Sequence, residues 1–258
     1  MKNRRVHTVL MDAHRARTPL LFLLLDPDRG TVAEACDTAR IAHEAGVDAF
    51  LVGGSLTAHG SLDAYLRDVK TVTDRPVVLF PGGLHQISGE ADAILFLSII
   101  SGRNPDSLIH QHVQAAPMLR RLGLEAVSTA YMLIEAGAVS SAEFMSGTRP
   151  IPREKTDIAV AHALAAELLG FTAIYLEAGS GAPLPVPAAM IARVAQSVDV
   201  PLLVGGGLRS PEAAAEAARS GATAVVVGNH FEAKAHHAQL RDFAVAVHTA
   251  RNPAGTAV

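Results

Sequence analysis

The 258-residue sequence contains no tryptophan and one cysteine, and aromatic residues make up only 4% of it. Cys36 has no second cysteine in the chain, which excludes an internal disulfide and is typical of a protein in a reducing compartment. An excess of charge of one sign is also missing. The formal net charge is −3, so the composition does not indicate a nucleic-acid partner.

Long apolar segments are missing as well. The most apolar run near the start of the sequence, Leu21–Leu25, stops at Asp26. A membrane-spanning helix needs ~20 apolar residues and the core of a signal peptide needs ~7–15. We therefore expect a cytoplasmic protein without a membrane span.

Hydrophobic residues make up 49% of the chain, and its length is close to the ~250 residues of a (β/α)8 barrel. Apolar runs typical of strands covered on both faces alternate with helical patterns. The predicted strands are residues 21–25, 48–52, 77–80, 93–97, 126–134, 173–177, 200–204 and 223–227. The predicted helices are residues 31–45, 61–73, 104–122, 154–169, 187–197, 211–220 and 231–250, with an earlier one within 2–17 over the barrel floor. We predict an α/β fold in which residues 1–258 form a single (β/α)8 TIM-barrel domain.

One interval between predicted strands is too short to contain a helix. Between Phe80 and Ala93 the chain includes Pro81 and several glycines. These residues are too few for a full helix with its two connecting loops. We expect the helix after the third strand to be shortened or missing, which would leave an apolar opening in the wall of the barrel.

Glycine-rich junctions follow three of the predicted strands in the last third of the chain. Glycine exposes backbone N–H groups, and the loops after strands seven and eight of such barrels bind phosphate. The predicted phosphate-binding residues are Tyr175, Leu176, Glu177, Ala178, Gly179, Ser180, Gly181, Gly205, Gly206, Gly228 and Asn229. Any one of these junctions alone is more often a tight turn.

Two oxygen-bearing residues follow the first two predicted strands. Asp26 ends the first strand, and Ser55 follows the second after two glycines. Catalytic groups of such barrels gather at this end of the strands. A carboxylate and a hydroxyl suit Mg²⁺, which completes its shell with water and substrate phosphate. We predict a Mg²⁺ site at Asp26 and Ser55, with a turn aspartate before Pro27 as the alternative for Asp26.

Glu177 ends the sixth predicted strand beside the glycine junctions. A carboxylate there can position and deprotonate the hydroxyl of a small phosphorylated substrate. The alternative is a rim glutamate paired with Arg209 or Lys155. Tyr175 points to the same side of the strand as Glu177 and is predicted to donate to a substrate oxygen, with core packing as its alternative.

Zinc is not indicated by the twelve histidines. They form no HExxH motif and no cluster with cysteine. Solvated helix faces account for most of them.

Longer motifs surround these residues. They are Leu25-Asp26-Pro27-Asp28, Gly53-Gly54-Ser55, Leu95-Phe96-Leu97-Ser98 with Arg103-Asn104-Pro105, Ile151-Pro152-Arg153-Glu154-Lys155, residues 175–181, residues 204–207 and Gly228-Asn229. With them, nearly the whole chain resembles the geranylgeranylglyceryl phosphate synthase family, which includes bacterial heptaprenylglyceryl phosphate synthases. The family fold is a modified barrel in which the helix after strand three is replaced.

The resemblance implies a prenyltransferase that joins a polyprenyl diphosphate, such as geranylgeranyl diphosphate, to the hydroxyl of sn-glycerol 1-phosphate through an ether bond. It implies that Asp26 and Ser55 bind the Mg²⁺ at the diphosphate and that the glycine junctions hold the glyceryl phosphate, with Glu177 on its hydroxyl. The family also implies a homodimer or larger homo-oligomer, and we expect a transient membrane-surface contact during product release.

Some segments depart from the family pattern. Leu24 stands where some members have a lysine, Ala136-Gly137-Ala138 replaces Pro-Gly-Ser, and Asp106-Ser107 replaces an aromatic pair. These changes lie where the prenyl chain or the acceptor would be sensed. The same chemistry with farnesyl diphosphate and 3-phosphoglycerate, as in moenomycin-type antibiotic biosynthesis, is therefore an alternative.

Two further alternatives remain for the function. A metal-independent sugar-phosphate isomerase or lyase would use Asp26 and Glu177 as an acid/base pair on the same fold, and a regulatory barrel would bind phosphate without turnover. Arg149, Arg153 and Lys155 are candidates to meet the diphosphate when a loop closes, with a solvated basic loop as the alternative.

Overall fold

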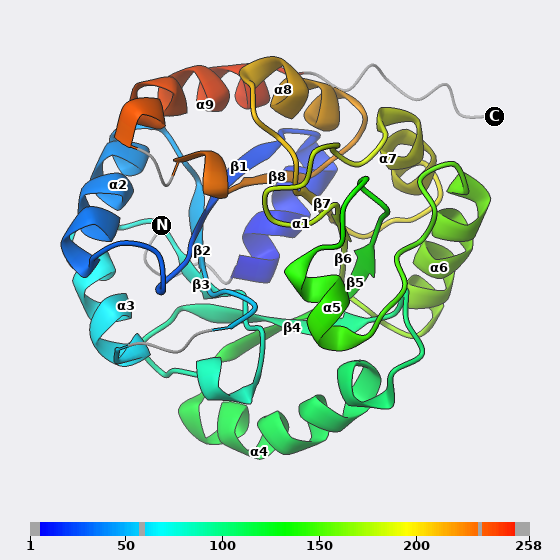
Figure 1. Cartoon of the computed structure of the whole chain (residues 1–258), viewed down its shortest axis with the longest axis horizontal. Coiled ribbons are helices and arrows are strands. Elements are labelled where there is room, and N and C mark those ends of the chain that lie inside the picture. Colours follow the sequence, from blue (N-terminus) through cyan, green and yellow to red (C-terminus); the bar gives the residue numbers. More distant parts are fainter. Residues whose placement is uncertain (1–5, 57–59, 232–233, 251–258) are drawn as a thin grey trace.

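The computed structural model describes residues 6–56, 60–231 and 234–250. Its strands are β1 Leu20–Leu25, β2 Ala49–Val52, β3 Val77–Leu79, β4 Ala93–Ile99, β5 Glu125–Leu133, β6 Ala173–Glu177, β7 Leu202–Gly205 and β8 Ala224–Val227. They pair in parallel in sequence order, and β8 closes the ring by pairing with β1 (Figure 1). The predicted (β/α)8 barrel is confirmed.

The helices surround the barrel in a ring (Figure 1). They are α2 Val32–Ala45, α3 Leu62–Thr71, α4 Gln111–Leu122, α6 Thr156–Leu168, α7 Ala188–Ala195, α8 Pro211–Arg219 and α9 Leu240–Thr249. A short helix, α5 Ser141–Ser146, lies inside this ring and was not predicted. Shorter 3₁₀ and π segments are η1 Leu84–Gln86, η2 Asp106–His110, η3 Asn229–Phe231 and η4 Lys234–Gln239.

The predicted gap in the helical ring is confirmed between β3 and β4. In this interval, all of which is described, the chain forms only the 3₁₀ turn η1. The side chain of Gln86 within it is buried, and its amide donates to the carbonyl of Gly54 at 2.7 Å. The connection therefore folds back over the end of β2 instead of covering the outside of the barrel.

Two other helix predictions need correction. The predicted helix at 104–122 begins with the π segment η2 and becomes α-helical at Gln111. The predicted continuous helix at 231–250 is wrong, because η3 and η4 are 3₁₀ turns and the α-helix begins at Leu240. In both places the apolar pattern identified the segment but not the hydrogen-bond register of its first turns.

The strands separate two apolar layers. One cluster fills the barrel interior and includes Phe22, Leu51, Tyr131 and Tyr175. The larger cluster lies between the strands and the outer helices. Because side chains alternate along a strand, Tyr175 and Glu177 share the inner side, whereas Leu176 belongs to the outer layer.

Helix α1 Val6–Ala16 closes the N-terminal end of the barrel, as predicted within residues 2–17. The backbone N–H groups of Val6 and His7 donate to the carboxylate of Glu125 at the start of β5, at 2.8 and 3.2 Å. Leu10 is fully buried and belongs to the interior cluster. A carboxylate at a helix N-terminus and an apolar plug thus fix α1 under the barrel.

We predict that Leu10→Ala lowers the free energy of unfolding by about 2–5 kcal/mol, because it leaves a cavity at the barrel floor. Urea unfolding followed by circular dichroism measures this change. Val245→Ala removes an exposed apolar side chain from α9 and should change the free energy by less than about 0.5 kcal/mol. An equal decrease in the free energy of unfolding in both variants would contradict the role of Leu10 in filling the barrel floor.

Candidate active site

A cavity of about 760 Å³ opens at the C-terminal ends of the strands. Asp26 and Ser55 line it from the ends of β1 and β2, and Tyr175 and Glu177 line it from β6. Phe80, Leu97 and Ile99 supply an apolar wall on the side where the outer helix is missing. The cavity, called the mouth cavity below, therefore combines acidic side chains with an apolar side.

Glu177 is the most deeply buried carboxylate of this cavity, with 6% of its surface exposed. The backbone N–H of Gly179 donates to its Oε1 at 2.6 Å, and the hydroxyls of Tyr131 and Tyr175 donate to the same carboxylate. Burial raises the pKa of Glu177 to about 7, and these three hydrogen bonds partly oppose the shift. A carboxyl that titrates near neutrality can accept a proton from a substrate hydroxyl at physiological pH.

Among the described residues, Glu177 forms no rim ion pair with Arg209 or Lys155, the two partners that the sequence left open. Arg209 instead donates to the carbonyls of Gly181 and Ala182, at 2.8 and 3.1 Å. Arg153 donates to the carbonyls of Glu135 and Pro185, at 3.0 and 3.4 Å. Both guanidinium groups hold loops at the mouth together, whereas Glu177 is bound by neutral donors.

Tyr131 is a site residue that the sequence analysis missed. The register of β5 and β6 places it beside Tyr175, and the two ring centroids lie 5.3 Å apart. Phe80 stacks on Tyr175 at 5.4 Å and contacts Tyr131 edge to face at 5.9 Å. Burial, followed by the Glu177 carboxylate, raises the pKa of both tyrosines well above 10. Both hydroxyls therefore remain protonated donors.

Core packing, the alternative weighed for Tyr175, is observed, whereas donation to a substrate oxygen stays a prediction. Its ring packs in the barrel interior, and its hydroxyl reaches Glu177. For Tyr131 the available indication was a hydroxyl-bearing residue within the apolar run that ends the predicted strand at 126–134. The partner of that hydroxyl lies on another strand, so only the register identifies it.

Two glycines at the end of β7 allow the backbone to approach this carboxyl group. A Cβ on Gly205 would overlap the Tyr175 hydroxyl, and one on Gly206 would lie 2.5 Å from Oε1 of Glu177. Gly206 also has a φ of +83°, which side-chain-bearing residues rarely adopt. These positions therefore require glycine in the observed arrangement.

The predicted phosphate-binding residues divide into two groups. Gly179, Ser180, Gly181, Gly206 and Gly228 line the mouth cavity together with Tyr175 and Glu177. Leu176 and Ala178 belong to the layer between barrel and helices, and Gly205 lies behind Tyr175. Asn229 begins η3, but its side chain lies outside the described part of the structure.

Asp26 lies against the glycine turn that follows β2. A Cβ on Gly54 would be 2.9 Å from its Oδ1, and that oxygen accepts the N–H of Asp28 at 3.0 Å. Its Oδ2 lies 3.5 Å from Nε of Arg29. Ser55, next to Gly54, lines the same cavity as Asp26. These residues fit Mg²⁺, which commonly binds through one or two protein oxygens together with phosphate and water.

No cluster of three or more His, Cys, Asp or Glu side chains suited to a metal occurs in the described ranges. A cation beside Asp26 and Ser55 would therefore take its remaining ligands from water and from substrate phosphates. Such an open set of ligands suits Mg²⁺ better than a structural zinc site.

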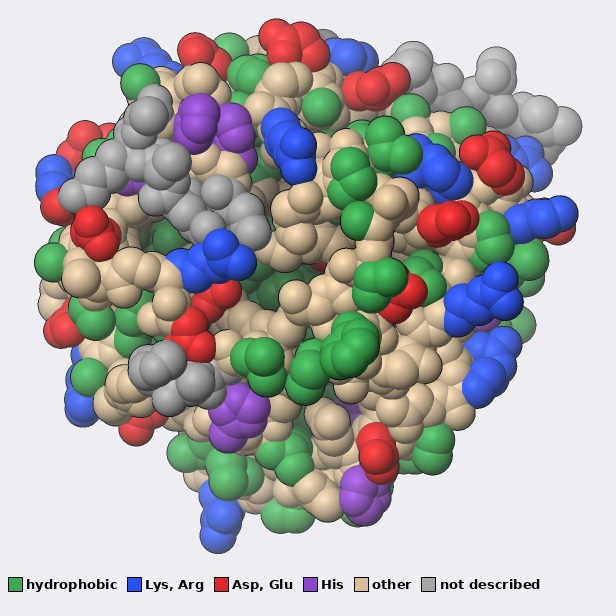
Figure 2. Space-filling view, viewed as in Figure 1, with side chains coloured by type: hydrophobic (Ala, Val, Ile, Leu, Met, Phe, Trp, Pro, Cys, Tyr) green, Lys and Arg blue, Asp and Glu red, His purple; other side chains and the backbone are tan. Residues whose placement is uncertain are grey.

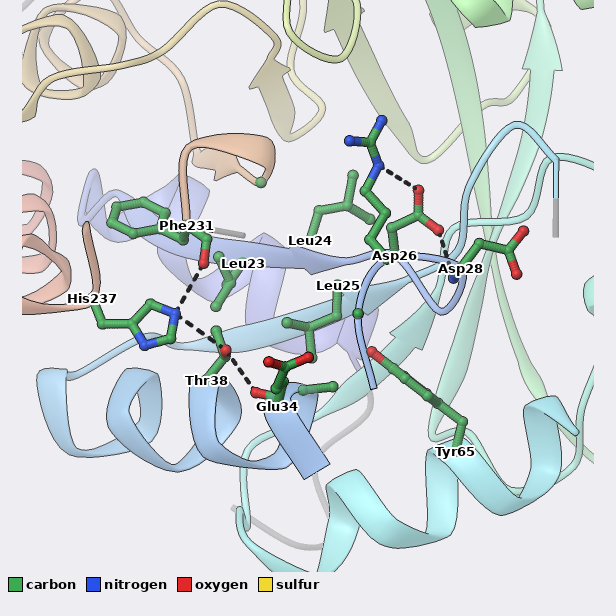
Figure 3. A pocket seen from close by; sticks show the side chains of 14 residues that line it. Leu23, Leu24, Leu25, Asp26, Asp28, Glu34, Thr38, Tyr65, Phe231 and His237 are labelled. Atoms are coloured by element: carbon green, nitrogen blue, oxygen red, sulfur yellow. Dashed lines mark hydrogen bonds and ion pairs between the residues drawn. The ribbon is translucent and has the colours of Figure 1, made fainter. Parts of the chain in front are cut away.

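A second cavity, of about 720 Å³, lies on the other side of Asp26. Figure 3 shows Leu23 and Leu25 on one wall, with Tyr65 and His237 at its sides. Nε2 of His237 donates to the carbonyl of Phe231 at 3.0 Å and lies 3.3 Å from the Thr38 hydroxyl. These contacts join η4 to η3 and to α2. Asp26 and Arg29 line both cavities and stand on the boundary between them.

Residues 11–247 match the PcrB family. The chain is 42% identical to the geranylgeranylglyceryl phosphate synthase of Chitinophaga pinensis over 246 residues, which cover 95% of this chain and 97% of that protein. It is 45% identical to the enzyme of the same name from Korarchaeum cryptofilum, with coverage of 84% and 89%.

Solved structures agree with these relatives. The (S)-3-O-geranylgeranylglyceryl phosphate synthase of Thermoplasma acidophilum, in complex with its substrate sn-glycerol-1-phosphate, has a TM-score of 0.90 and 31% identity, covering 95% of this chain and 99% of that one. Tryptophan synthase of Mycobacterium tuberculosis, with a TM-score of 0.62 and 15% identity, shares the fold alone. The family resemblance of the sequence motifs is thereby confirmed, and the chain belongs to the PcrB family.

Proposed function

We propose that this protein joins a polyprenyl diphosphate, geranylgeranyl diphosphate or one of similar length, to the hydroxyl of sn-glycerol 1-phosphate through an ether bond. As a member of its family it is a prenyltransferase. The main support for the position of the acceptor is the surroundings of the Glu177 carboxyl group. It is buried at the mouth cavity, accepts hydrogen bonds from two tyrosine hydroxyls and lies against glycines. This arrangement suits a small phosphorylated alcohol.

In this reaction Glu177 takes the proton of the acceptor hydroxyl. The hydroxyl oxygen then forms a bond to the first carbon of the prenyl chain while the bond from that carbon to the diphosphate breaks. The raised pKa of about 7 makes Glu177 a stronger base than an ordinary carboxylate and leaves it largely ionised just above neutrality. The hydroxyls of Tyr131 and Tyr175 and the backbone N–H of Gly179 donate hydrogen bonds to the carboxylate and hold it in place.

The phosphate of the acceptor would lie on the backbone N–H groups of Gly181, Gly206 and Gly228, which line the cavity beside Glu177, while the N–H of Gly179 stays on the Glu177 carboxylate. The hydrocarbon chain would lie along Phe80, Leu97 and Ile99, toward the interval without an outer helix. Holding both substrates in one cavity converts their encounter into a reaction between neighbouring groups.

Asp26 and Ser55 would hold the Mg²⁺, which when bound supplies positive charge to the leaving diphosphate. Arg29 lies beside Asp26 and lines the same cavity, so its guanidinium is placed to meet the diphosphate as well. Arg153, considered for that role from the sequence, is engaged with two loop carbonyls and positions the mouth loops.

The function is tested by incubating the protein with farnesyl or geranylgeranyl diphosphate and either sn-glycerol 1-phosphate or 3-phosphoglycerate, followed by mass analysis of the ether product. We expect product from geranylgeranyl diphosphate and sn-glycerol 1-phosphate, loss of turnover with EDTA, and at least about a hundredfold lower turnover for Asp26→Asn. If product formed only from farnesyl diphosphate and 3-phosphoglycerate, these two compounds would be the substrates instead of geranylgeranyl diphosphate and sn-glycerol 1-phosphate. Turnover that survives EDTA would exclude the Mg²⁺ site.

We expect kcat/KM for the acceptor to rise with pH up to about 7 and then level off, because Glu177 must lose its proton to act as the base. Glu177→Gln should lower kcat/KM by about 10²–10⁴-fold and remove this acid limb. Stopped assays across the pH range, with circular dichroism to check folding, measure both effects. An unchanged pH profile in the variant would exclude Glu177 as the base.

The same residue should also link stability to pH. In the folded state its pKa is about 7, above the ordinary 4.5, so folding holds the proton more tightly. The folded state therefore loses stability as pH rises from about 4.5 to 7, by on the order of 3 kcal/mol in total. Glu177→Gln should accordingly become more stable than the unsubstituted protein above pH 7, as measured by urea unfolding at several pH values.

Tyr131→Phe should move the acid limb of kcat/KM upward by roughly 1 pH unit, because the lost hydrogen bond had stabilised the ionised form of Glu177. The phenyl ring retains the contacts with Phe80 and Tyr175. Tyr65→Phe is the matched control, since Tyr65 is also a buried tyrosine but lines the second cavity. An identical shift in both variants would argue against a direct role for Tyr131.

A further inference from the structure

Large apolar side chains are exposed around the opening of the mouth cavity. Phe144 on α5 is 78% exposed and Val139, just before α5, is 69% exposed. Met145, Leu56 and Leu184 are exposed as well. We call these five residues the mouth patch. Figure 2 shows apolar side chains gathered near the centre of this face, in the region that α5 occupies in Figure 1.

Hydrogen bonds at both ends of α5 hold the exposed part of the patch on this helix in place. The Ser140 hydroxyl accepts the N–H of Glu143 at 3.1 Å and caps α5 at its start. At the other end, the amide of Asn104 donates to the carbonyl of Ser146 at 2.7 Å. The inner side of α5 is thereby fixed to the barrel, and Phe144 is held pointing outward. Burying a large apolar side chain is favourable, so a fixed exposed one indicates a partner surface.

The patch extends across two adjoining loops. A Cβ on Gly137, in the loop before α5, would lie 3.5 Å from Pro183 and 3.6 Å from Leu184. Arg153 links the same loops by donating to the carbonyls of Glu135 and Pro185. Val139 and Leu184 are therefore carried by loops that pack on one another.

The patch is also continuous with the interior of the cavity. Met145 and Leu56 are exposed to solvent and at the same time line the mouth cavity. An apolar path thus runs from the wall of Leu97 and Ile99 to the outer surface at Met145 and Leu56. The partner must cover apolar side chains without closing the route by which a long hydrocarbon chain enters or leaves.

On the basis of the proposed function, we infer that the mouth patch seats on the surface of a lipid bilayer, from which the prenyl donor enters and into which the ether product leaves. A bilayer covers apolar side chains and accepts a hydrocarbon chain at the same place, whereas a folded protein over the opening would obstruct it. No helix in residues 6–56, 60–231 or 234–250 combines the length and apolar character of a membrane span. The contact is therefore confined to the interface, with a few apolar side chains inserted among the lipids.

The chain supplies a matched control at the other end of the barrel. Leu168, at the last turn of α6, is 89% exposed, and the adjacent Leu169 is exposed as well. Outer helices run opposite to the strands in such a barrel, so these leucines lie at the N-terminal end, away from the cavity. They have exposed apolar surface comparable to the patch but no connection to the active site.

The experiment is flotation of the substrate-free protein with vesicles of phosphatidylcholine and phosphatidylglycerol in a roughly three-to-one ratio. Three proteins are compared: the unsubstituted chain, Val139→Ser with Phe144→Ser, and Leu168→Ser with Leu169→Ser. We expect the unsubstituted chain and the leucine control to float equally. The mouth-patch variant should partition roughly tenfold or more in favour of water.

Turnover of geranyl diphosphate, a short donor that dissolves in water, should be the same in all three proteins, because none of the four substituted residues lines the mouth cavity. Turnover of geranylgeranyl diphosphate presented in vesicles should fall only in the mouth-patch variant. Vesicle binding without turnover of any donor would refute the proposed function and leave the bilayer surface standing.

Three results would overturn the proposal that the mouth patch binds a bilayer surface. One is failure of the unsubstituted chain to float, and another is an equal loss of flotation in both double variants. The third is a dimer of the unsubstituted chain in sedimentation analysis that dissociates only in the mouth-patch variant, which would make a second copy of the chain the partner.

Discussion

A carboxyl group buried at the end of a barrel strand is the constraint on which the site depends. Glu177 loses most of its hydration, and an ionised carboxylate in such a place is costly unless donors replace the water. The Gly179 N–H and the hydroxyls of Tyr131 and Tyr175 replace part of it. The balance leaves the pKa near 7. Glu177 can therefore exist in either protonation state near neutral pH, and this property comes from its surroundings.

The same requirement explains the backbone around it. Donors can reach a buried carboxylate only where neighbouring strands come close, and glycine at 205 and 206 permits that approach. Under the proposed function, Gly206 would also offer its N–H group to the acceptor phosphate while it lets the barrel close around Glu177. The packing around Glu177 and the proposed binding of the acceptor therefore both require glycine at position 206.

The short connection between β3 and β4 gives the mouth cavity its asymmetry. Polar groups gather on the sides of β1, β2 and β6, and apolar side chains occupy the side without an outer helix. Two substrates of opposite character, a phosphorylated alcohol and a hydrocarbon chain, can then share one cavity. The exposed residues of α5 continue the apolar side to the surface.

Local patterns in the sequence determined the strands, the position of Asp26 and Glu177 at strand ends, and the missing helix, because each depends on a short contiguous run of residues. The tertiary structure decided the contacts between residues that are far apart in the sequence. Tyr131 meets Glu177 only through the register of β5 and β6, and α5 is fixed partly by Asn104 from a distant segment. The pKa of Glu177 follows from burial by residues from several strands. A sequence records which groups are present, but their desolvation and their partners across strands exist only once the barrel has closed.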